Sequence, residues 1–299
     1  MSGTARIGVS LLVGIALVGI AFASWSRPLT ILHTNDLHLR FARLDSLREL
    51  IEEERAKGAP VLLVDAGDTW QDFRRPSAMV GGADDMVEWM NGVGYDAMAL
   101  GNHDLYWGPD RLFELVDQAG FAVLCANLEP AGGFATPFAS SVVRSIAGIR
   151  VLLIGVITDQ YLPHPDYPWL RHVEPGKAIV REIDKLAEPA DLIVAVGHVP
   201  IDEAVRITTA VSSIDLFVTG HSHEETREPV RAGKTLIVQT GAFARNLGRL
   251  VLDVDAEGAT LVSYDLLETE KAPTQWGRGL LQFAAVAVAL LATALLVLL

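Results

Sequence analysis

The stretch Tyr95-Asp96-Ala97-Met98-Ala99-Leu100-Gly101-Asn102-His103-Asp104 decides the fold class. Its first six residues form a mostly apolar run that predicts a buried strand, and the next four are small or polar. In open α/β sheets, ligands bind at the carboxyl ends of strands, which is where Asn102 and His103 would stand. Alternatively, the same four residues would serve as ordinary turn and capping residues.

Four further apolar runs end in the same way. Each leads within a few positions into Asp or His residues, and turn chemistry alone does not explain so regular a pattern. Because parallel strands present their carboxyl ends at one edge of a sheet, we expect these polar residues to lie together. The runs finish at Asp36 and His38, at Asp68, at His198, and at His221 and His223.

Strands and helices alternate along the body of the chain. Amphipathic patterns between the strands predict helices, such as one that begins near Leu44 and ends before Gly58. Hairpin patterns over 141–154 and 250–266 add antiparallel strands. This order predicts an α/β fold in which two packed mixed sheets are flanked by helices in four α/β/β/α layers, with the polar strand ends at one edge. The other predicted strands are 29–33, 61–64, 95–100, 121–126, 192–196, 216–219 and 236–239.

The composition limits the class of partner. The chain has 299 residues and a formal net charge of −13, which argues against a nucleic-acid polymer as partner. A small phosphate ester remains compatible with this charge if metal ions supply positive charge. The single cysteine, Cys125, excludes an internal disulfide. It lies in an apolar run, so we expect a buried core residue.

Both ends of the sequence are apolar. Residues 7–24 and 279–299 carry no charged side chain, and Arg278 lies just before the second segment. Each segment is long enough to cross a bilayer as a helix. Ala21-Phe22-Ala23 fits a secretory cleavage site, so residues 1–26 are interpreted as either a signal peptide or an N-terminal membrane anchor. A buried core helix is the alternative for 279–299, which we interpret as a C-terminal transmembrane helix.

These segments divide the sequence into four parts. Between the two ends we expect one large domain over 27–268 and a linker over 269–278. The signal-like start favours a membrane-anchored protein whose domain lies outside the cytoplasm, at the cell surface or in the periplasm. The flanking charges say little about orientation.

Oxygen and imidazole side chains dominate the strand ends, and no thiolate is among them. This ligand set suits divalent ions such as Mn, Fe, Zn, Co or Ni. Since one metal takes three or four ligands, seven candidates correspond to two metals that share one carboxylate. For a single histidine the alternative is a structural role, which we assign to His33, His164 and His172. The ligand candidates are Asp36, His38, Asp68, Asn102, His198, His221 and His223.

The order and spacing of these residues resemble a known family. The calcineurin-like metallophosphoesterases have motifs similar to Asp36-x-His38, Gly67-Asp68, Gly101-Asn102-His103-Asp104, Gly197-His198 and Gly220-His221-Ser222-His223. The longer segments 34–38, 65–69 and 90–97 resemble the corresponding motifs in the catalytic domain of the 5′-nucleotidase and cyclic phosphodiesterase branch. The resemblance extends from about Leu29 to Asp253.

The resemblance implies a role for each candidate. The first of two divalent metals would be held by Asp36, His38, Asp68 and His223, and the second by Asp68, Asn102, His198 and His221. A hydroxide that bridges the two metals would attack phosphorus. His103 would be a catalytic residue outside the ligand set, stabilising the phosphoryl oxygens or protonating the leaving group. Asp104 would orient His103.

The sequence departs from that branch at three points. Leu39 and Tyr106 stand where the branch usually has a glycine and an aspartate, which weakens the case for Asp104. We also expect only a short linker and the apolar segment after Leu267, in place of the C-terminal nucleotide-binding domain of the branch. The stretches 70–75 and 159–169 are candidate substitutes, although ordinary loop packing explains them equally well. Their aromatic residues include Trp70, Tyr161, Tyr167 and Trp169.

Three functional hypotheses follow. The leading one is a membrane-tethered enzyme that hydrolyses a small phosphomonoester such as a nucleotide. The second is a phosphodiesterase or pyrophosphatase acting on cyclic nucleotides or lipid-linked phosphates, because the same pair of metals serves both reactions. The third is an inactive binding protein, which predicts missing ligands, whereas all seven candidates are present.

Overall fold

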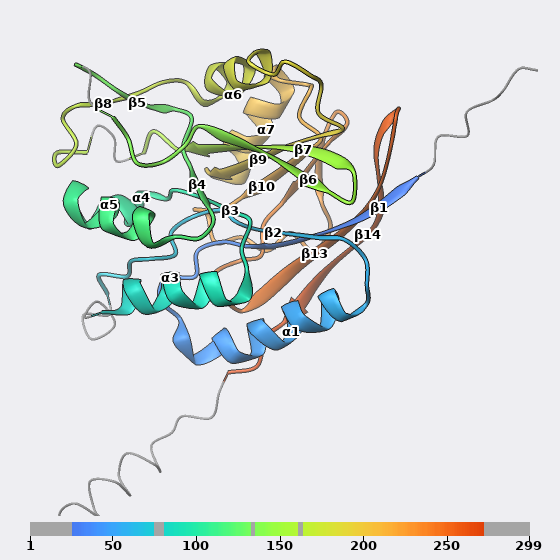
Figure 1. The fold of residues 1–299 in the computed structure, drawn as a ribbon, viewed down its shortest axis with the longest axis horizontal. Helices are drawn as coiled ribbons and strands as arrows, with labels where there is room; N and C mark the ends of the chain where they lie inside the picture. Colours follow the sequence, from blue (N-terminus) through green and yellow to red (C-terminus); the bar gives the residue numbers. More distant parts are fainter. Residues whose placement is uncertain (1–25, 75–80, 133–134, 161–163, 272–299) are drawn as a thin grey trace, which may run out of the picture.

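The computed structural model describes residues 26–74, 81–132, 135–160 and 164–271, which form four layers. Two six-stranded sheets pack face to face in the middle. Helices α1 (Leu44–Ala56) and α3 (Gly82–Val93) lie outside one sheet, whereas α6 (Pro175–Asp184) and α7 (Ile201–Ala210) lie outside the other (Figure 1). The predicted α/β/β/α arrangement is therefore confirmed.

The first sheet consists of β1 (Arg27–Thr34), β2 (Val61–Asp65), β3 (Ala97–Ala99), β4 (Ala122–Leu124), β13 (Asn246–Asp255) and β14 (Gly258–Glu268). Its order is β14-β13-β1-β2-β3-β4. Strands β1 to β4 run parallel, so their carboxyl ends lie at one edge. On the other side of β1, the antiparallel hairpin of β13 and β14 completes the sheet.

The second sheet consists of β6 (Ser141–Ile146), β7 (Ile149–Ile157), β9 (Leu192–His198), β10 (Leu216–Thr219), β11 (Val230–Ala232) and β12 (Thr235–Val238). Its order is β11-β12-β10-β9-β7-β6. The four inner strands are parallel, and the two edge strands, β6 and β11, are antiparallel to their neighbours. The inner strands therefore also share one carboxyl edge.

Alternation along each strand builds the core. In β1, Leu29 and Ile31 enter the apolar cluster between the two sheets, whereas Leu32 enters the cluster beneath α1 and α3. This follows from the two-residue period of a strand, which sends neighbouring side chains to opposite faces. Each of these three leucine or isoleucine side chains is fully buried, which is worth about 1.5–3 kcal/mol per side chain.

Three short features of the structure are not expected from the sequence. After β3 the chain does not open into a loop at once but forms the one-turn helix α4 (Asn102–Leu105), before α5 (Pro109–Gln118). A short turn η1 (Phe41–Arg43) precedes α1, and a separate ribbon pairs β5 (Leu128–Pro130) with β8 (Leu170–His172). The sequence pattern predicts neither of these, because each is only three residues per segment.

The apolar ends lie outside the described residues, so the signal peptide or anchor at 1–26 and the transmembrane helix at 279–299 stay predictions. The same applies to the linker beyond Lys271. Among the residues that the structure describes, none forms a helix of the length and apolar character needed to cross a bilayer.

The residues that we assigned to structural roles have buried or packed side chains. Cys125 is buried, and burial raises the pKa of its thiol to about 12. His172 Nε2 lies 2.9 Å from the amide nitrogen of Asn127, and His164 is 7% exposed. These contacts are those of ordinary packing.

His33 is a fully buried titratable group. Its ring stacks on Tyr264 at 6.0 Å, and neither ring nitrogen has a hydrogen-bond partner among the described residues. Burial lowers the pKa of His33 to about 3. The fold therefore favours the neutral imidazole, since nothing near the ring stabilises its charge.

We predict that replacing His33 with Leu removes part of the acid sensitivity of the fold. Below pH 6.5 the unfolded chain binds a proton at His33 that the folded protein does not, so the free energy of unfolding falls as the pH falls. When the pH is lowered from about 7.5 to about 5, the free energy of unfolding of the parent protein should fall by about 2 kcal/mol more than that of His33→Leu. Denaturant unfolding at constant metal concentration measures this, and equal losses in both proteins would contradict it.

Candidate metal centre

Loops from both sheets meet at the carboxyl edge. In the first sheet they follow β1, β2 and β3, and in the second they follow β9 and β10. Two contacts join the sheets there. His198 Nδ1 lies 2.8 Å from the carbonyl oxygen of Ala66, and the backbone N–H of His221 donates to Asp36 Oδ2 at 3.0 Å. The polar strand ends thus meet as the alternation of strands and helices predicts.

Five of the seven ligand candidates have a left-handed backbone. Asp36 and His38 do not continue the extended backbone of β1, since their φ values are 51° and 47°. The chain turns there while it stays hydrogen-bonded to the loop after β2, through Asp36 N to Gly67 O and His38 N to Asp68 O. Such conformations cost about 1–3 kcal/mol each and cluster at functional sites. The five are Asp36, His38, Asp68, His221 and His223.

Two glycines allow the loops after β2 and β3 to touch. A Cβ atom on Gly101 would lie 2.1 Å from Asp68 Oδ1, and one on Gly67 would lie 2.7 Å from the backbone nitrogen of Gly101. Both distances are shorter than any tolerable contact. The glycines in these two motifs are therefore required by the close approach of the loops.

The first group of candidates combines Asp36, His38 and His223. Their ligand atoms all lie within 4.8 Å of one another. His223 Nε2 is 3.1 Å from Asp36 Oδ1 and 3.3 Å from His38 Nε2. Among the described residues, no hydrogen-bond donor satisfies Asp36 Oδ1, although it is buried. An unsatisfied buried carboxylate oxygen that faces imidazole nitrogens fits a cation between them.

The second group combines Asp68, His198 and His221. His198 Nε2 lies 3.1 Å from Asp68 Oδ2, and His221 Nδ1 lies 3.3 Å from His198 Nε2. Asn102 belongs beside this group, because its Oδ1 is 3.0 Å from His221 Nδ1. The donor set of carboxylate, amide oxygen and two imidazoles suits a borderline divalent ion.

Backbone carbonyls fix the tautomers of two histidines. The carbonyl oxygen of Gln71 lies 3.0 Å from His38 Nδ1, and that of Ala66 lies 2.8 Å from His198 Nδ1. A carbonyl only accepts hydrogen bonds, so each Nδ1 carries the proton. In the neutral ring, which is the form that binds a metal, each Nε2 then has a lone pair that faces the centre, as in metal-ligating histidines.

Asp68 lies between the two groups. Besides its contact with His198, Asp68 Oδ2 is 3.8 Å from His38 Nε2 and 3.9 Å from His103 Nε2. Burial alone would raise the pKa of Asp68, but His198 lowers it well below its ordinary value. Burial would likewise lower the pKa of His198, but the Asp68 carboxylate raises it to about 10. One carboxylate is therefore within reach of both groups.

His103 lies beside Asp68 and opens onto solvent. Its Nδ1 lies 3.0 Å from Gln71 Oε1, and its ring stacks on Phe73 at 5.2 Å. Partial burial lowers its pKa, and the Asp68 carboxylate opposes that shift. The geometry also groups His103 with His38 and Asp68 as a third possible ligand set. The expectation that His103 stands outside the ligand set therefore stays a prediction.

Asp104 has a different set of contacts from the one that the resemblance implies. Its carboxylate accepts hydrogen bonds from four backbone N–H groups at 2.9–3.1 Å, and the side chain is fully buried. Burial and the Asp68 carboxylate raise the pKa of Asp104. The side-chain oxygen within hydrogen-bond distance of His103 Nδ1 is that of Gln71. Asp104 thus positions the Asp68 loop, and the four donors are Asp68, Thr69, Trp70 and Gly101.

An open cavity of about 330 Å³ gives access to the centre. Phe73, 57% exposed, and Tyr106, 37% exposed, stand at its wall with Arg74. Of the aromatic residues proposed as substitutes for a second domain, Trp70 and Tyr167 are instead buried in the core. Tyr161 lies outside the described residues, and Trp169 packs against the core. The cavity lining includes Asp68, Asn102, His103, His221 and His223.

Three neighbours of the centre are absent from the motifs. Gln71 contacts two histidines, and Gln160 Oε1 lies 2.8 Å from His221 Nε2. Phe243 packs against the rings of His38 and His223, with centroids 5.5 and 5.1 Å away. Nothing in the local sequence marks Gln160 or Phe243, because tertiary structure alone brings them to the centre.

Comparison with known proteins identifies the family. The model of the calcineurin-like phosphoesterases matches residues 29–225, and the chain belongs to that family. It is 31% identical over 297 residues to a snake venom 5′-nucleotidase from Gloydius brevicauda, covering 85% of this chain and 50% of that protein. Identity to the human 5′-nucleotidase is 29%, covering 87% of this chain and 52% of that one.

The fold is also shared with solved structures. A 5′-nucleotidase precursor from Thermus thermophilus superimposes with a TM-score of 0.71 and 26% identity, covering 88% of this chain and 60% of that one. The chain spans about half the length of the curated relatives cited above.

We predict that Asp104→Asn destabilises the loop that carries Asp68. An amide has one oxygen where the carboxylate has two, so two buried N–H groups lose their acceptor at about 1–3 kcal/mol each. The free energy of unfolding should fall by at least about 2 kcal/mol, and the metal content of the purified protein should fall with it. Asp117→Asn, on the exposed surface of α5, is the matched control. Unchanged stability in Asp104→Asn would contradict the role given to Asp104.

Proposed function

We propose that this protein hydrolyses a small phosphomonoester, most simply a nucleotide, at a centre that takes two divalent metal ions. The observation that carries the proposal is the position of Asp68 between two groups of ligand candidates. Its Oδ2 lies within 3.9 Å of ring nitrogens from three histidines, contributed by both sheets. Family membership and the 5′-nucleotidase relatives support the same class of reaction.

In this proposal each metal has its own ligands and shares Asp68. Asp36, His38 and His223 hold one ion, and Asn102, His198 and His221 hold the other. When bound, the two ions supply positive charge to the phosphoryl oxygens and lower the pKa of the attacking water. The orphaned oxygen of Asp36 and the facing imidazole nitrogens support this assignment.

The protein's own residues bind and orient the ester. His103 opens onto the cavity, where its ring can donate a hydrogen bond to a phosphoryl oxygen or a proton to the leaving group. Gln71 fixes the orientation of that ring from the opposite side. Arg74, at the wall of the same cavity, adds a positive charge toward an anionic substrate.

A nucleotide is the favoured substrate because an exposed aromatic ring stands beside the reacting centre. Phe73 presents a face on which a base can stack, and the relatives that bear the name 5′-nucleotidase point the same way. A diester or pyrophosphate is the second candidate, and a binding protein without activity is the third. Hydrolysis of nucleoside monophosphates, bis-aryl phosphate and a lipid phosphate in Mn, Zn, Co, Fe and Mg separates all three.

Anchoring of the domain outside the cytoplasm is proposed from the sequence alone. The uncharged segments 7–24 and 279–299 support it. Retention of the full chain in carbonate-washed membranes is the expected result, whereas release into the wash would contradict anchoring.

We predict that His103→Ala lowers kcat by about 10²–10⁴ while the metal content stays at that of the parent protein. The reason is that His103 acts on the substrate and not on the ions. Metal analysis and steady-state kinetics on the same preparation measure both quantities. Loss of an ion in His103→Ala would instead make His103 a ligand.

Asp68→Ala is the companion variant. Because Asp68 contacts both groups, we expect it to lose both ions. A variant that retains the full metal content would refute the shared carboxylate.

We predict that Phe73→Ala raises KM for nucleoside monophosphates about tenfold, since stacking of one base is worth about 1–3 kcal/mol. KM for glycerol phosphate, which has no base, should change much less. Val262→Ala, a change at an equally exposed apolar residue on β14, is the control. Equal effects of Phe73→Ala on both substrates would mean that Phe73 supports His103 and does not select a base.

A further inference from the structure

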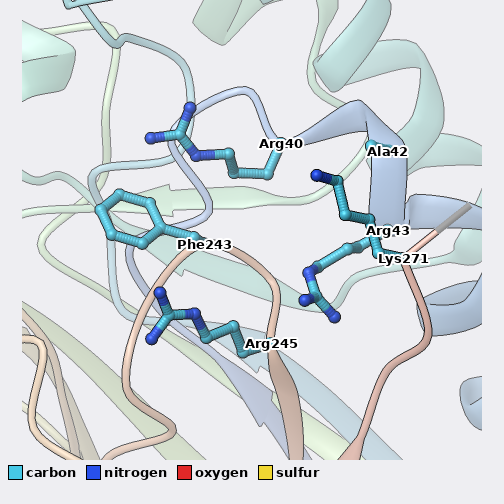
Figure 2. Close-up of a pocket in the computed structure, with 6 residues that line it drawn as sticks. All are labelled: Arg40, Ala42, Arg43, Phe243, Arg245 and Lys271. Atoms are coloured by element: carbon cyan, nitrogen blue, oxygen red, sulfur yellow. The ribbon is translucent and has the colours of Figure 1, made fainter. Parts of the chain in front are cut away.

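A second cavity, of about 430 Å³, is lined mainly by cationic side chains. Four of the six lining residues are Arg or Lys and none is acidic, although the whole chain has a net charge of −13. Its volume is in the range of small-molecule pockets. The lining residues are Arg40, Ala42, Arg43, Phe243, Arg245 and Lys271 (Figure 2).

Three distant segments build this basic pocket. Arg40 and Arg43 come from the turn before α1, Arg245 lies between β12 and β13, and Lys271 follows β14. Figure 2 shows the charged ends of these side chains around one open space beside the Phe243 ring. Like charges brought together by separate segments repel one another, so an anion among them would stabilise the arrangement.

Phe243 separates the basic pocket from the candidate metal centre. On one side, the guanidinium carbon of Arg40 lies 4.4 Å from the centroid of the Phe243 ring. On the other, the ring contacts His38 and His223. The backbone N–H of Phe243 donates to the carbonyl oxygen of Asp36 at 2.7 Å, which fixes the position of this residue. Only the Phe243 ring therefore lies between the basic pocket and two ligand candidates. A molecule of nucleotide size is long enough to reach from the pocket to the metal centre.

Arg74 connects the two cavities. It lines the cavity over the metal centre, and its guanidinium carbon lies 5.8 Å from the Phe243 centroid. Arg74 and Arg40 both pair with the buried Asp72, at 3.1 and 3.0 Å. One carboxylate thus faces two guanidinium groups, and a net positive charge remains along the path between the cavities.

Two of the pocket's cations are available to a ligand. Within the described residues, Arg245 and Lys271 are exposed, and neither takes part in an ion pair. The Arg245 guanidinium carbon lies 5.8 Å from the Phe243 centroid, which holds it toward the pocket. Guanidinium groups bind phosphate oxygens through paired N–H donors, and a cluster of them favours a multiply charged anion over a single carboxylate.

We propose that the basic pocket is a phosphate subsite that binds a second, non-reacting phosphate group of the substrate. The favoured substrate class is then a molecule with two separate phosphate groups, such as a nucleoside bisphosphate. One phosphate is hydrolysed at the metal centre, and the other is held by Arg40, Arg245 and Lys271. This inference rests on the proposed function and adds the substrate class to it.

The first test compares two substrates on the full chain in detergent. We expect kcat/KM to be higher for a nucleoside 3′,5′-bisphosphate than for the 5′-monophosphate. Arg245→Ala should reduce that ratio about tenfold, and Arg245→Lys should restore part of it. Lys234→Ala, at the turn between β11 and β12, removes one positive charge elsewhere and should leave the ratio unchanged. A ratio that Arg245→Ala does not alter would overturn the proposal.

The second test does not depend on turnover. Inorganic pyrophosphate should bind the metal-free protein, dialysed free of chelator, and Arg245→Ala should weaken this binding about tenfold in calorimetry. If the protein binds pyrophosphate but hydrolyses none of the esters, the proposed function is refuted and the anion site is not. A soluble short-chain phosphatidate is the third probe. If it displaces pyrophosphate while Arg245→Ala leaves the substrate ratio unchanged, the pocket binds a lipid phosphate, and its proposed role in substrate binding is overturned. No binding at all would refute the anion site.

Discussion

The position of one buried carboxylate, that of Asp68, governs the rest of the candidate centre. Its Oδ1 accepts the backbone N–H of His103, and its Oδ2 faces imidazoles from both sheets. The close approach at Gly101 and the four hydrogen bonds to Asp104 hold the loop in a left-handed conformation that it would not adopt alone. Backbone strain near Asp68 is thus balanced by hydrogen bonds to Asp104, which is not itself a ligand candidate.

The sequence is sufficient to predict the layers and the meeting of the strand ends. The alternation of buried side chains along β1 predicts the layers. The polar residues after β2, β3, β9 and β10 predict where the strand ends meet. It is not sufficient for the backbone at Asp36 and His38, because their left-handed turns depend on hydrogen bonds to the distant loop after β2. Gln160 and Phe243 were missed for the same reason. Their position depends on tertiary structure, and no local pattern reports it.

Acidic and basic side chains are grouped in separate regions around the candidate site. Acidic groups at the centre would hold cations, whereas the four cationic side chains of the basic pocket lie beyond Phe243. The Phe243 ring packs against Arg40 on one side and against His38 and His223 on the other. Selectivity for an anionic substrate can therefore arise in a chain whose overall charge is strongly negative.

The first strand has its two neighbours at very different distances along the chain. β1 pairs with β2 after a short helix, but its other edge pairs with β13, so that Arg27 faces Val254. During synthesis, that edge stays unpaired until almost the whole domain has been made. An exposed strand edge is a template for pairing with other chains. The pairing of β1 with β13 is thus a contact between residues far apart in sequence, and contacts of this kind slow folding in general.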